Sequence, residues 1–426
     1  MKKQLIPLLF FLCVFNAFAQ NIEYAKEVVQ TLASPEFKGR GYVDDGNKIA
    51  ARYIAKQFKS IGLQPFNKSY HQKFKVDVNT FPAEMLLELD GQALIPGEDY
   101  IIDPLSGSLK GAFELIHIKK EDLLNIDKVK STLAKAEGKV LLVDETSFNI
   151  ENKEQQQQAN ELFNFIKYSP KISVAAVIVY TNSKLTWSTA TLQASKPIFI
   201  VKKQLALENL QQVTININAE LINYQTQNII GYIKGSEEPD SFLVATAHYD
   251  HLGLMGAETL FPGANDNASG VAMLLNLAKH FKQAPPKYSM VFMALGAEEI
   301  GIVGAKHFVD NPLFDLGRIK FLVNFDLAGT GVDGIKVVNG SVHKQQFKQL
   351  VQFNTQKNYL HSVQERGPAC NSDHCPFHQK AVPCFYLYTL GGIKAYHDIY
   401  DRHETLPLNE FEDYCRLMID FYNSFE

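Results

Sequence analysis

The sequence predicts an α/β fold, in which a doubly wound, mostly parallel sheet is flanked by helices and carries an inserted, smaller β-rich domain. From about residue 224 onward, apolar strand-like runs alternate with helical patterns, as in a parallel sheet covered on both faces. Residues 71–223 instead carry short β-branched runs separated by polar segments. A chain of 426 residues also exceeds what one hydrophobic core usually supports. We therefore expect one domain from residues 20–70 and 224–426, and another from residues 71–223.

The N-terminal segment has the pattern of a cleavable secretory signal. Lys2 and Lys3 precede an apolar run over residues 5–15, and Ala17-Phe18-Ala19 supplies a small-x-small cleavage pattern before Gln20. The apolar run is shorter than a membrane span, and no later segment is both long enough and uncharged. We expect residues 1–19 to be a signal peptide, and the mature protein to be periplasmic or extracellular without a membrane span.

Charge and cysteine content limit the partners and the compartment. Loss of Lys2 and Lys3 lowers Lys+Arg from 42 to 40 against 46 Asp+Glu, so the formal net charge moves from -4 to -6. This mild acidity argues against a nucleic-acid partner. Export permits disulfides, and Cys370 and Cys375 bracket a short polar stretch that a bridge could close. Cys384 and Cys415 are read as buried free thiols, and composition leaves the oligomeric state open.

The first part of the chain predicts helices. Gly39-Arg40-Gly41 interrupts the helical pattern, and a longer helix follows. Its apolar side chains recur on one face, at Ile49, Ile54, Ala55, Phe58 and Ile61. Residues 71–223 then predict strands, of which the clearest are 140–143, 177–180 and 213–215. Polar segments such as Gln155 to Gln158 separate these strands.

The last part predicts strands and helices in alternation. We expect strands at 241–247, 288–295 and 321–325 and a helix over 268–281. In sheets of this kind, ligands bind beyond the carboxyl ends of the strands. The residues that follow the three strands are therefore the first candidates for a functional site.

Acidic and imidazole side chains occupy these positions. They follow the strands or open the helix, and in chain order they are His248, Asp250, Asp266, Glu298, Glu299 and Asp326. Carboxylates held so close repel one another unless protons or cations lie between them. Mixed imidazole and carboxylate ligands suit zinc better than manganese or cobalt. The pattern therefore predicts a metal site.

Five segments around these residues carry a family resemblance. HYDHLG, PGANDNASGVA, GAEEIGIVGA, NFDLAG and YHDIYD, in this order, resemble the co-catalytic zinc aminopeptidases and related carboxypeptidases of peptidase family M28. The resemblance covers nearly all of residues 224–403, and SPEFKGRGY resembles the N-terminal helices of that family. It implies a zinc exopeptidase fold, a peptide substrate and two zinc ions.

The resemblance also implies a set of metal ligands. Asp266 would bridge both zinc ions, His248 and Asp326 would complete one site, and Glu299 and His397 the other. The choice of His397 rests on family order, because His251, His374 and His403 are nearby alternatives in the sequence. These three, together with His307, we read first as structural or peripheral.

Two carboxylates gain catalytic roles from the same resemblance. Glu298 would act as general base, taking a proton from a water activated by the two zinc ions and passing it to the leaving amine. Asp250 would orient His248 by accepting its other ring N–H. Each residue alone has an ordinary reading, such as a helix cap for Asp266 or a core histidine for His248. The joint pattern outweighs these readings.

Two other regions would shape access to the site. Ser372-Asp373-His374 resembles a family element in the pocket wall, where a Cys370–Cys375 bridge would hold the loop. Residues 71–223 resemble a protease-associated domain in pattern and position. We expect this module to cover part of the crevice and to contribute no chemistry of its own.

The expected activity is that of a secreted zinc exopeptidase, with an aminopeptidase preferred. An M28 carboxypeptidase stays open, because Arg366 could bind a free carboxylate. A glutaminyl cyclase on the same fold would use one zinc, whereas a complete second ligand set is present here. A binding protein that had lost its metals should show substituted ligands, and none is substituted.

Overall fold

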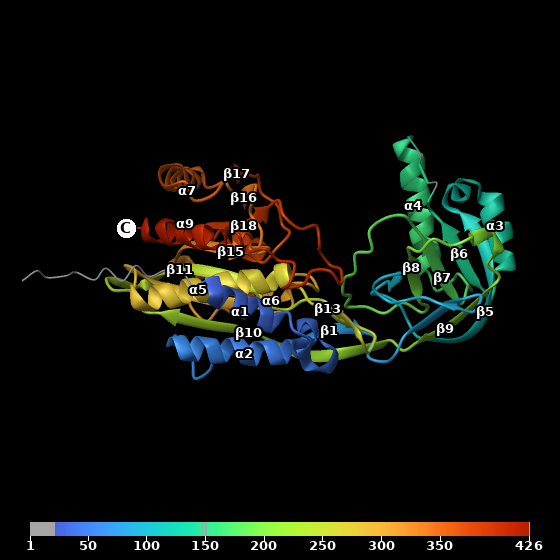
Figure 1. Ribbon diagram of the computed structural model, residues 1–426, viewed down its shortest axis with the longest axis horizontal. Coiled ribbons are helices and arrows are strands. Elements are labelled where there is room, and N and C mark those ends of the chain that lie inside the picture. Colours follow the sequence, from blue (N-terminus) through green and yellow to red (C-terminus); the bar gives the residue numbers. More distant parts are fainter. Residues whose placement is uncertain (1–21, 147, 150, 426) are drawn as a thin grey trace, which may run out of the picture.

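The computed structural model describes residues 22–425 except residues 147 and 150, and its elements form two bodies that lie side by side (Figure 1). The expected signal peptide lies outside the described residues. Within them, two eight-stranded sheets and a two-stranded hairpin are present. No described helix is both long and apolar enough to cross a membrane. The expected α/β class is confirmed, with a mixed rather than mostly parallel sheet in each body.

The first sheet has four parallel strands at its centre, joined on each side by an antiparallel pairing, and the outermost pair at one edge is again parallel. In spatial order its strands are β1 (His71–Thr80), β10 (Glu220–Ile233), β14 (Tyr288–Leu295), β11 (Glu238–His248), β15 (Ile319–Phe325), β18 (Cys384–Leu390), β16 (Gly334–Val338) and β17 (Val363–Glu365). The three strands expected in this part of the chain correspond to β11, β14 and β15. These three are direct neighbours, so their carboxyl ends meet at one edge.

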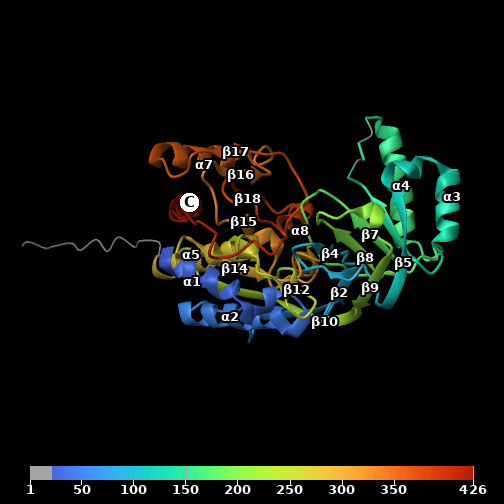
Figure 2. The same cartoon turned by 45° about the vertical axis from the view of Figure 1, so that its right-hand side comes forward.

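Helices cover both faces of the first sheet (Figure 2). They are α1 (Ile22–Leu32), α2 (Gly46–Ile61), α5 (Gly270–Gln283), α6 (Val303–Asp310), α7 (Lys344–Lys357), α8 (His374–Gln379) and α9 (Phe411–Asn423). Strand β11 shows why both faces are apolar. Its Leu243 and Ala245 pack in the core cluster that contains α1, α2, α5 and α9, whereas Val244 packs with Phe308 of α6 and Phe377 of α8. Each fully buried Leu, Val or Phe side chain contributes about 1.5–3 kcal/mol.

The second sheet lies within the segment expected to be an inserted module. Its strands, in spatial order, are β3 (Gln92–Ala93), β2 (Leu86–Leu89), β9 (Gln212–Ile217), β5 (Leu109–Lys119), β6 (Val140–Asp144), β7 (Ala176–Tyr180), β8 (Ile198–Val201) and β4 (Tyr100–Ile102). Helices α3 (Ile126–Lys135) and α4 (Lys153–Tyr168) pack on it. The polar segment Gln155 to Gln158 is the exposed start of α4, capped by the Asn152 side chain.

The expected domain boundaries need one correction. Strand β1 pairs with β10 from His71 to Thr80, so residues 71–80 and 220–223 belong to the first sheet rather than to the second. The alternation of side chains in β1 is a local property of a half-buried strand, and it does not say which sheet the strand joins. The second body is therefore connected through this long antiparallel ribbon.

Candidate metal centre

The carboxyl ends of β11, β14 and β15 bring the expected site residues together. His248 ends β11, Glu298 and Glu299 follow β14, and Asp326 follows β15. Asp266 lies in the π-helical turn Ala264–Ser269 that leads into α5. The turn begins after Gly263, which has φ +60°, and a Cβ there would collide with the Asp266 carbonyl oxygen. The sequence predicted this meeting, because parallel strands end at the same edge.

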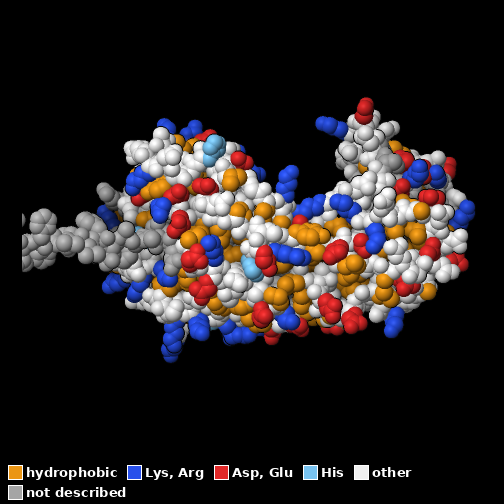
Figure 3. Space-filling model, in the orientation of Figure 1, with side chains coloured by type: hydrophobic (Ala, Val, Ile, Leu, Met, Phe, Trp, Pro, Cys, Tyr) orange, Lys and Arg blue, Asp and Glu red, His pale blue; other side chains and the backbone are white. Residues whose placement is uncertain are grey.

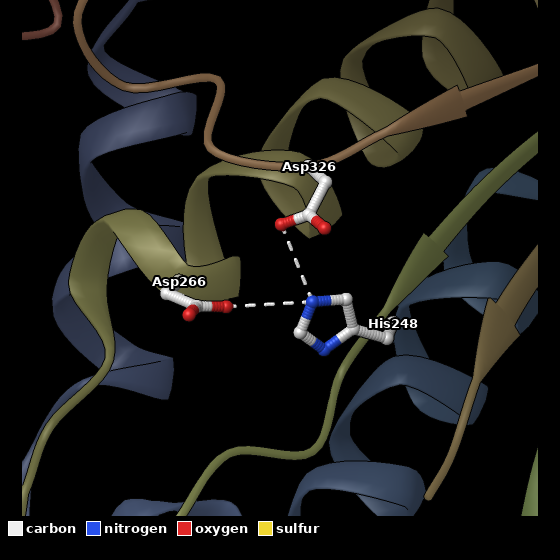
Figure 4. Close-up of side chains that lie close together, drawn as sticks. All are labelled: His248, Asp266 and Asp326. Carbon is white, nitrogen blue, oxygen red and sulfur yellow. Dashed lines mark hydrogen bonds and ion pairs between the residues drawn. The ribbon is translucent and has the colours of Figure 1, made fainter. Parts of the chain in front are cut away.

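His248, Asp266 and Asp326 form the first cluster (Figure 4). His248 Nε2 lies 3.3 Å from Asp326 Oδ1 and 3.4 Å from Asp266 Oδ1. The three side chains are 1%, 4% and 10% exposed, so water does not screen them. One nitrogen and two carboxylate oxygens thus converge on a point where a cation would have three ligands.

The second cluster uses the other oxygen of Asp266. His397 Nε2 lies 3.1 Å from Asp266 Oδ2 and 3.2 Å from Glu299 Oε2. Asp266 therefore faces one imidazole with each of its carboxylate oxygens, which is the arrangement of a bridging carboxylate. Of the alternatives to His397, His374 Nε2 bonds the Ala369 carbonyl and His403 pairs with Glu404.

His251 is also in this cluster, although we read it from the sequence as structural or peripheral. Its Nδ1 lies 2.7 Å from Glu299 Oε1 and 4.0 Å from Asp266 Oδ1. Its Nε2 is buried and has no hydrogen-bond partner among the described residues. Glu299 thus faces two imidazoles, one through each oxygen. The signal for this was the second histidine of HYDHLG, three residues after His248.

The tautomers of both principal imidazoles suit metal binding. His248 Nδ1 lies 3.1 Å from the Asp250 carbonyl oxygen, and His397 Nδ1 lies 3.0 Å from the Trp187 carbonyl oxygen. Because a carbonyl oxygen only accepts hydrogen bonds, each Nδ1 carries a proton. In the neutral rings, each Nε2 then points a lone pair at carboxylate oxygens. A proton or a metal cation must lie between them, and the donor set fits zinc.

The pKa values reflect the same demand for positive charge. Burial opposes protonation of His397, yet the negative charge of Glu299 and hydrogen bonding to Asp266 raise its pKa to about 11. Burial raises the pKa of Glu298 well above its usual range. The negative charges of Asp373, Glu299 and Asp326 raise this pKa further, whereas the charge of His248 lowers it. Cations bound between the carboxylates would lower the pKa of Glu298 again.

Asp250 acts differently from what we expected. The Asp250 carboxylate lies 3.9 Å from His248 Nδ1, and its main-chain carbonyl is the group that contacts the ring. The carboxylate instead accepts the backbone N–H groups of Glu298 at 3.1 Å and Glu299 at 3.3 Å. A spacing of two residues does not decide whether main chain or side chain faces a ring. Asp250 therefore holds the turn that carries Glu298 and Glu299.

Sequence reasoning gave no role to two buried charged residues beside the site. Asp401 accepts the backbone N–H groups of Asn265 at 2.8 Å and Asp266 at 2.9 Å. Arg40 is fully buried and donates five hydrogen bonds to the carbonyl oxygens of Leu32, Tyr249, Pro262, Gly263 and Asp266. Asp401 lies in the motif YHDIYD and Arg40 in SPEFKGRGY. Their hydrogen-bond partners are distant in the sequence, so the motifs alone did not indicate these contacts.

The loop before α8 contacts the first cluster. Ser372 donates to Asp326 Oδ2 at 3.0 Å and accepts from Asn324. Asp373 is buried without a hydrogen-bond partner for its carboxylate among the described residues, and burial raises its pKa to about 8. Cys370 and Cys375 form a disulfide, whereas Cys384 and Cys415 are free and buried. The loop therefore lies against the site, as expected, and the bridge is present.

Comparison with known proteins finds a family match over the part of the chain that carries the site. Residues 228–422 match Peptidase family M28, a range that contains every residue of both clusters. Over this range, which is somewhat less than half of the chain, the sequence is similar to M28 peptidases. It is 28% identical over 335 residues to Aminopeptidase YwaD of Bacillus subtilis (strain 168), a match that covers 73% of this chain and 66% of that protein. It is 31% identical over 157 residues to a probable zinc metalloprotease of Pyrenophora tritici-repentis (strain Pt-1C-BFP), covering 34% of each.

The chain spans less than two thirds of the length of these relatives. Two solved structures resemble it over nearly its whole length. BSAP, a zinc aminopeptidase from Bacillus subtilis, has a TM-score of 0.67 at 21% identity and covers 94% of each chain. The aminopeptidase from Aneurinibacillus sp. strain AM-1 has a TM-score of 0.62 at 20% identity, covering 95% of this chain and 93% of that chain. At these identities the likeness concerns the fold, which includes both bodies.

Proposed function

We propose that this protein is an exported zinc-dependent aminopeptidase that binds two zinc ions. The observation that carries the proposal is the pair of contacts made by Asp266. Its Oδ1 lies 3.4 Å from His248 Nε2, and its Oδ2 lies 3.1 Å from His397 Nε2. Asp266 would bridge the two ions, with His248 and Asp326 holding one and Glu299 and His397 the other. When bound, the zinc ions would lower the pKa of a water and polarise the scissile carbonyl.

Glu298 is the proposed general base. It follows Leu295 at the end of β14, and Asp250 fixes the backbone N–H groups of both Glu298 and Glu299. One side chain of this pair can then face a metal while the other faces the substrate, because consecutive residues point in different directions. In this role the Glu298 carboxylate removes the proton of the attacking water and delivers it to the leaving amine.

The acidic character of the site favours an aminopeptidase over a carboxypeptidase. A free α-amine could bind to the carboxylates beside the metals, whereas a free carboxylate would need a cationic partner. Arg366, the candidate for binding a C-terminal carboxylate, is exposed and donates to the Tyr388 hydroxyl at 3.1 Å. Two similar proteins, YwaD and BSAP, are aminopeptidases by name, which supports the same choice. The Cys370–Cys375 disulfide supports export, because such bonds persist in oxidising compartments.

The test uses the purified mature protein and peptides blocked at one end. We expect hydrolysis of a peptide with a free N-terminus and an amidated C-terminus, and none when the N-terminus is acetylated and the C-terminus is free. The reverse pattern would indicate a carboxypeptidase. Loss of ammonia from an N-terminal glutamine peptide without hydrolysis would indicate a glutaminyl cyclase.

Metal analysis completes the test. Two zinc ions per chain should be found, and activity should be lost on chelation and restored by zinc. Asp266→Asn should lose zinc from both sites, because it removes the bridging charge. His403→Ala is the matched control, since His403 pairs with Glu404 outside the clusters. Full activity after complete removal of zinc would overturn the proposal.

A further inference from the structure

The connection between β7 and β8 of the second sheet reaches into the candidate metal centre. Trp187, in this connection, donates its backbone N–H to the carbonyl oxygen of His397 at 2.9 Å. Its own carbonyl oxygen accepts from His397 Nδ1 at 3.0 Å. One residue of the second body therefore holds both the main chain and the ring of His397.

The contact with the ring sets the chemistry of His397. Because the Trp187 carbonyl accepts from Nδ1, the other ring nitrogen, Nε2, is left to face Asp266 and Glu299. The backbone of His397 has φ +52°, a value that residues other than glycine adopt uncommonly. The two hydrogen bonds between Trp187 and His397 help to hold this conformation.

The same connection contacts Glu299, the other member of this cluster. The Thr189 hydroxyl donates to the backbone carbonyl oxygen of Glu299 at 2.7 Å. Thr189 is only two residues from Trp187. A short segment of the second body thus holds two of the three proposed ligands of one zinc site.

Lys184 fixes the loop around His397 from the same side. Its ammonium lies 2.6 Å from Asp398 Oδ2 and donates to the carbonyl oxygens of Lys394 at 2.8 Å and Tyr396 at 3.0 Å. The Asp398 side chain is 7% exposed, so this pair is partly protected from screening by salt. Lys184 and Trp187 therefore contact the loop over residues 394–398, and Thr189 contacts Glu299.

The connection is itself firmly attached to its surroundings. The Trp187 indole N–H donates to the Ile102 carbonyl oxygen of β4 at 2.9 Å. Its ring packs against Phe261, with 4.7 Å between ring centroids, and is 4% exposed. The two bodies meet below the hollow that is visible between them on the upper side of Figure 3. The contact with His397 is thus made by an anchored segment rather than by a free loop.

We infer that Lys184, Trp187 and Thr189 are positioning residues for the zinc site formed by Glu299 and His397. Docking of the second body and zinc binding at this site then stabilise each other. The inference rests on the proposed function, because it requires that this cluster binds zinc. It changes the expectation that the inserted module only covers the crevice. Groups that orient metal ligands commonly change metal affinity by about 10-fold to 100-fold when they are removed.

The test is zinc affinity in variants that remove side-chain contacts of the connection. Lys184→Met removes the contacts to Asp398 and two carbonyl oxygens, and Thr189→Val removes the contact to Glu299. Two matched controls break similar contacts elsewhere. Lys203→Met breaks a 2.6 Å pair with Asp99 within the second body, and Thr80→Val removes a 3.0 Å bond to the Glu220 carbonyl oxygen.

Zinc stoichiometry and dissociation constants are measured by competition with a chromophoric chelator. We expect Lys184→Met and Thr189→Val to keep one zinc at the wild-type affinity and to bind the second about 10-fold to 100-fold more weakly. The controls should bind both ions as the wild type does. Circular dichroism and thermal unfolding of the zinc-free proteins establish that each variant is folded.

Hydrogen exchange gives a reciprocal readout that does not depend on a substitution. Because the coupling acts in both directions, adding zinc to the metal-free protein should slow exchange of the Trp187 amide. Amides of the distant strand β9 should not change. This inference alone would be overturned if the wild type binds two zinc ions, both variants bind them with unchanged affinity, and zinc leaves the exchange of the Trp187 amide unchanged. A wild type that binds no zinc would overturn the proposed function and the inference with it.

Discussion

Asp401 binds the backbone of Asp266: its Oδ2 accepts the Asp266 N–H at 2.9 Å, while its Oδ1 accepts the preceding N–H of Asn265. Asp250 binds the N–H groups of Glu298 and Glu299 in the same way. Two buried carboxylates therefore hold main-chain segments that carry proposed ligands, and neither is a proposed ligand itself. Such contacts orient the site without being visible in a ligand motif.

Asp401→Asn should weaken zinc binding and stability together. An amide offers one oxygen to the two N–H groups and turns an N–H₂ group toward one of them, which leaves a buried donor unpaired at a cost of about 1–3 kcal/mol. Urea unfolding and zinc analysis of the dialysed protein measure the two effects. Asp413→Asn, in a helix-surface pair with Arg416, is the control. Wild-type zinc content in Asp401→Asn would contradict the role assigned to Asp401.

Arg40→Met should destabilise the protein by at least about 3 kcal/mol, because five buried carbonyl oxygens lose their donor. Arg40 also lies in a field of carboxylates. Burial lowers its pKa to about 10, and the charges of Asp266 and Asp401 oppose that decrease. Chemical denaturation of the metal-free protein measures the loss. Arg318→Met, which removes an exposed arginine, should change stability by no more than about 0.5 kcal/mol. Equal effects of the two substitutions would contradict the prediction.

Glu298→Gln should abolish turnover while zinc stays bound. The amide keeps the size of the side chain but cannot accept the proton, and loss of a general base commonly lowers kcat by about 100-fold to 10,000-fold. Peptide hydrolysis and zinc content are measured on the same preparation. Glu404→Gln, in the exposed pair with His403, should leave both unchanged. An active Glu298→Gln enzyme with normal zinc would remove Glu298 from the mechanism.

His374 should make the folded protein less stable in acid. Burial lowers its pKa from the usual 6.5 to about 4, so the folded ring stays neutral where the unfolded ring gains a proton. The neutral ring makes its full contribution to the free energy of unfolding above about pH 6.5. This contribution, about 3 kcal/mol in total, is lost as the pH falls toward 4.

The measurement is the free energy of unfolding between these pH values for wild type and His374→Gln. Glutamine can still donate to the Ala369 carbonyl but does not titrate, so the contributions of all other groups cancel in the difference. The wild type should lose more stability than the variant across this range. Parallel pH profiles would show that His374 does not titrate as described.

Local patterns in the sequence determined the strands β11, β14 and β15, helix α5 and the residues at their ends. Each of these elements follows from apolar periodicity over about ten residues. The meeting of His248, Glu299 and Asp326 follows as well, because parallel neighbouring strands bring their carboxyl ends to one edge. No long-range information was needed for that part of the site.

Only the tertiary structure decided the contacts between distant segments. It placed His251 beside Glu299 and paired β1 with the first sheet. It also made the Asp250 carboxylate the acceptor of the Glu298 backbone N–H. It also set Trp187 against His397, which is 210 residues away. Each of these contacts joins, through hydrogen bonds or a strand pairing, segments that lie far apart in the sequence. A local pattern records which residues are buried, but it does not record which distant partner each buried group meets.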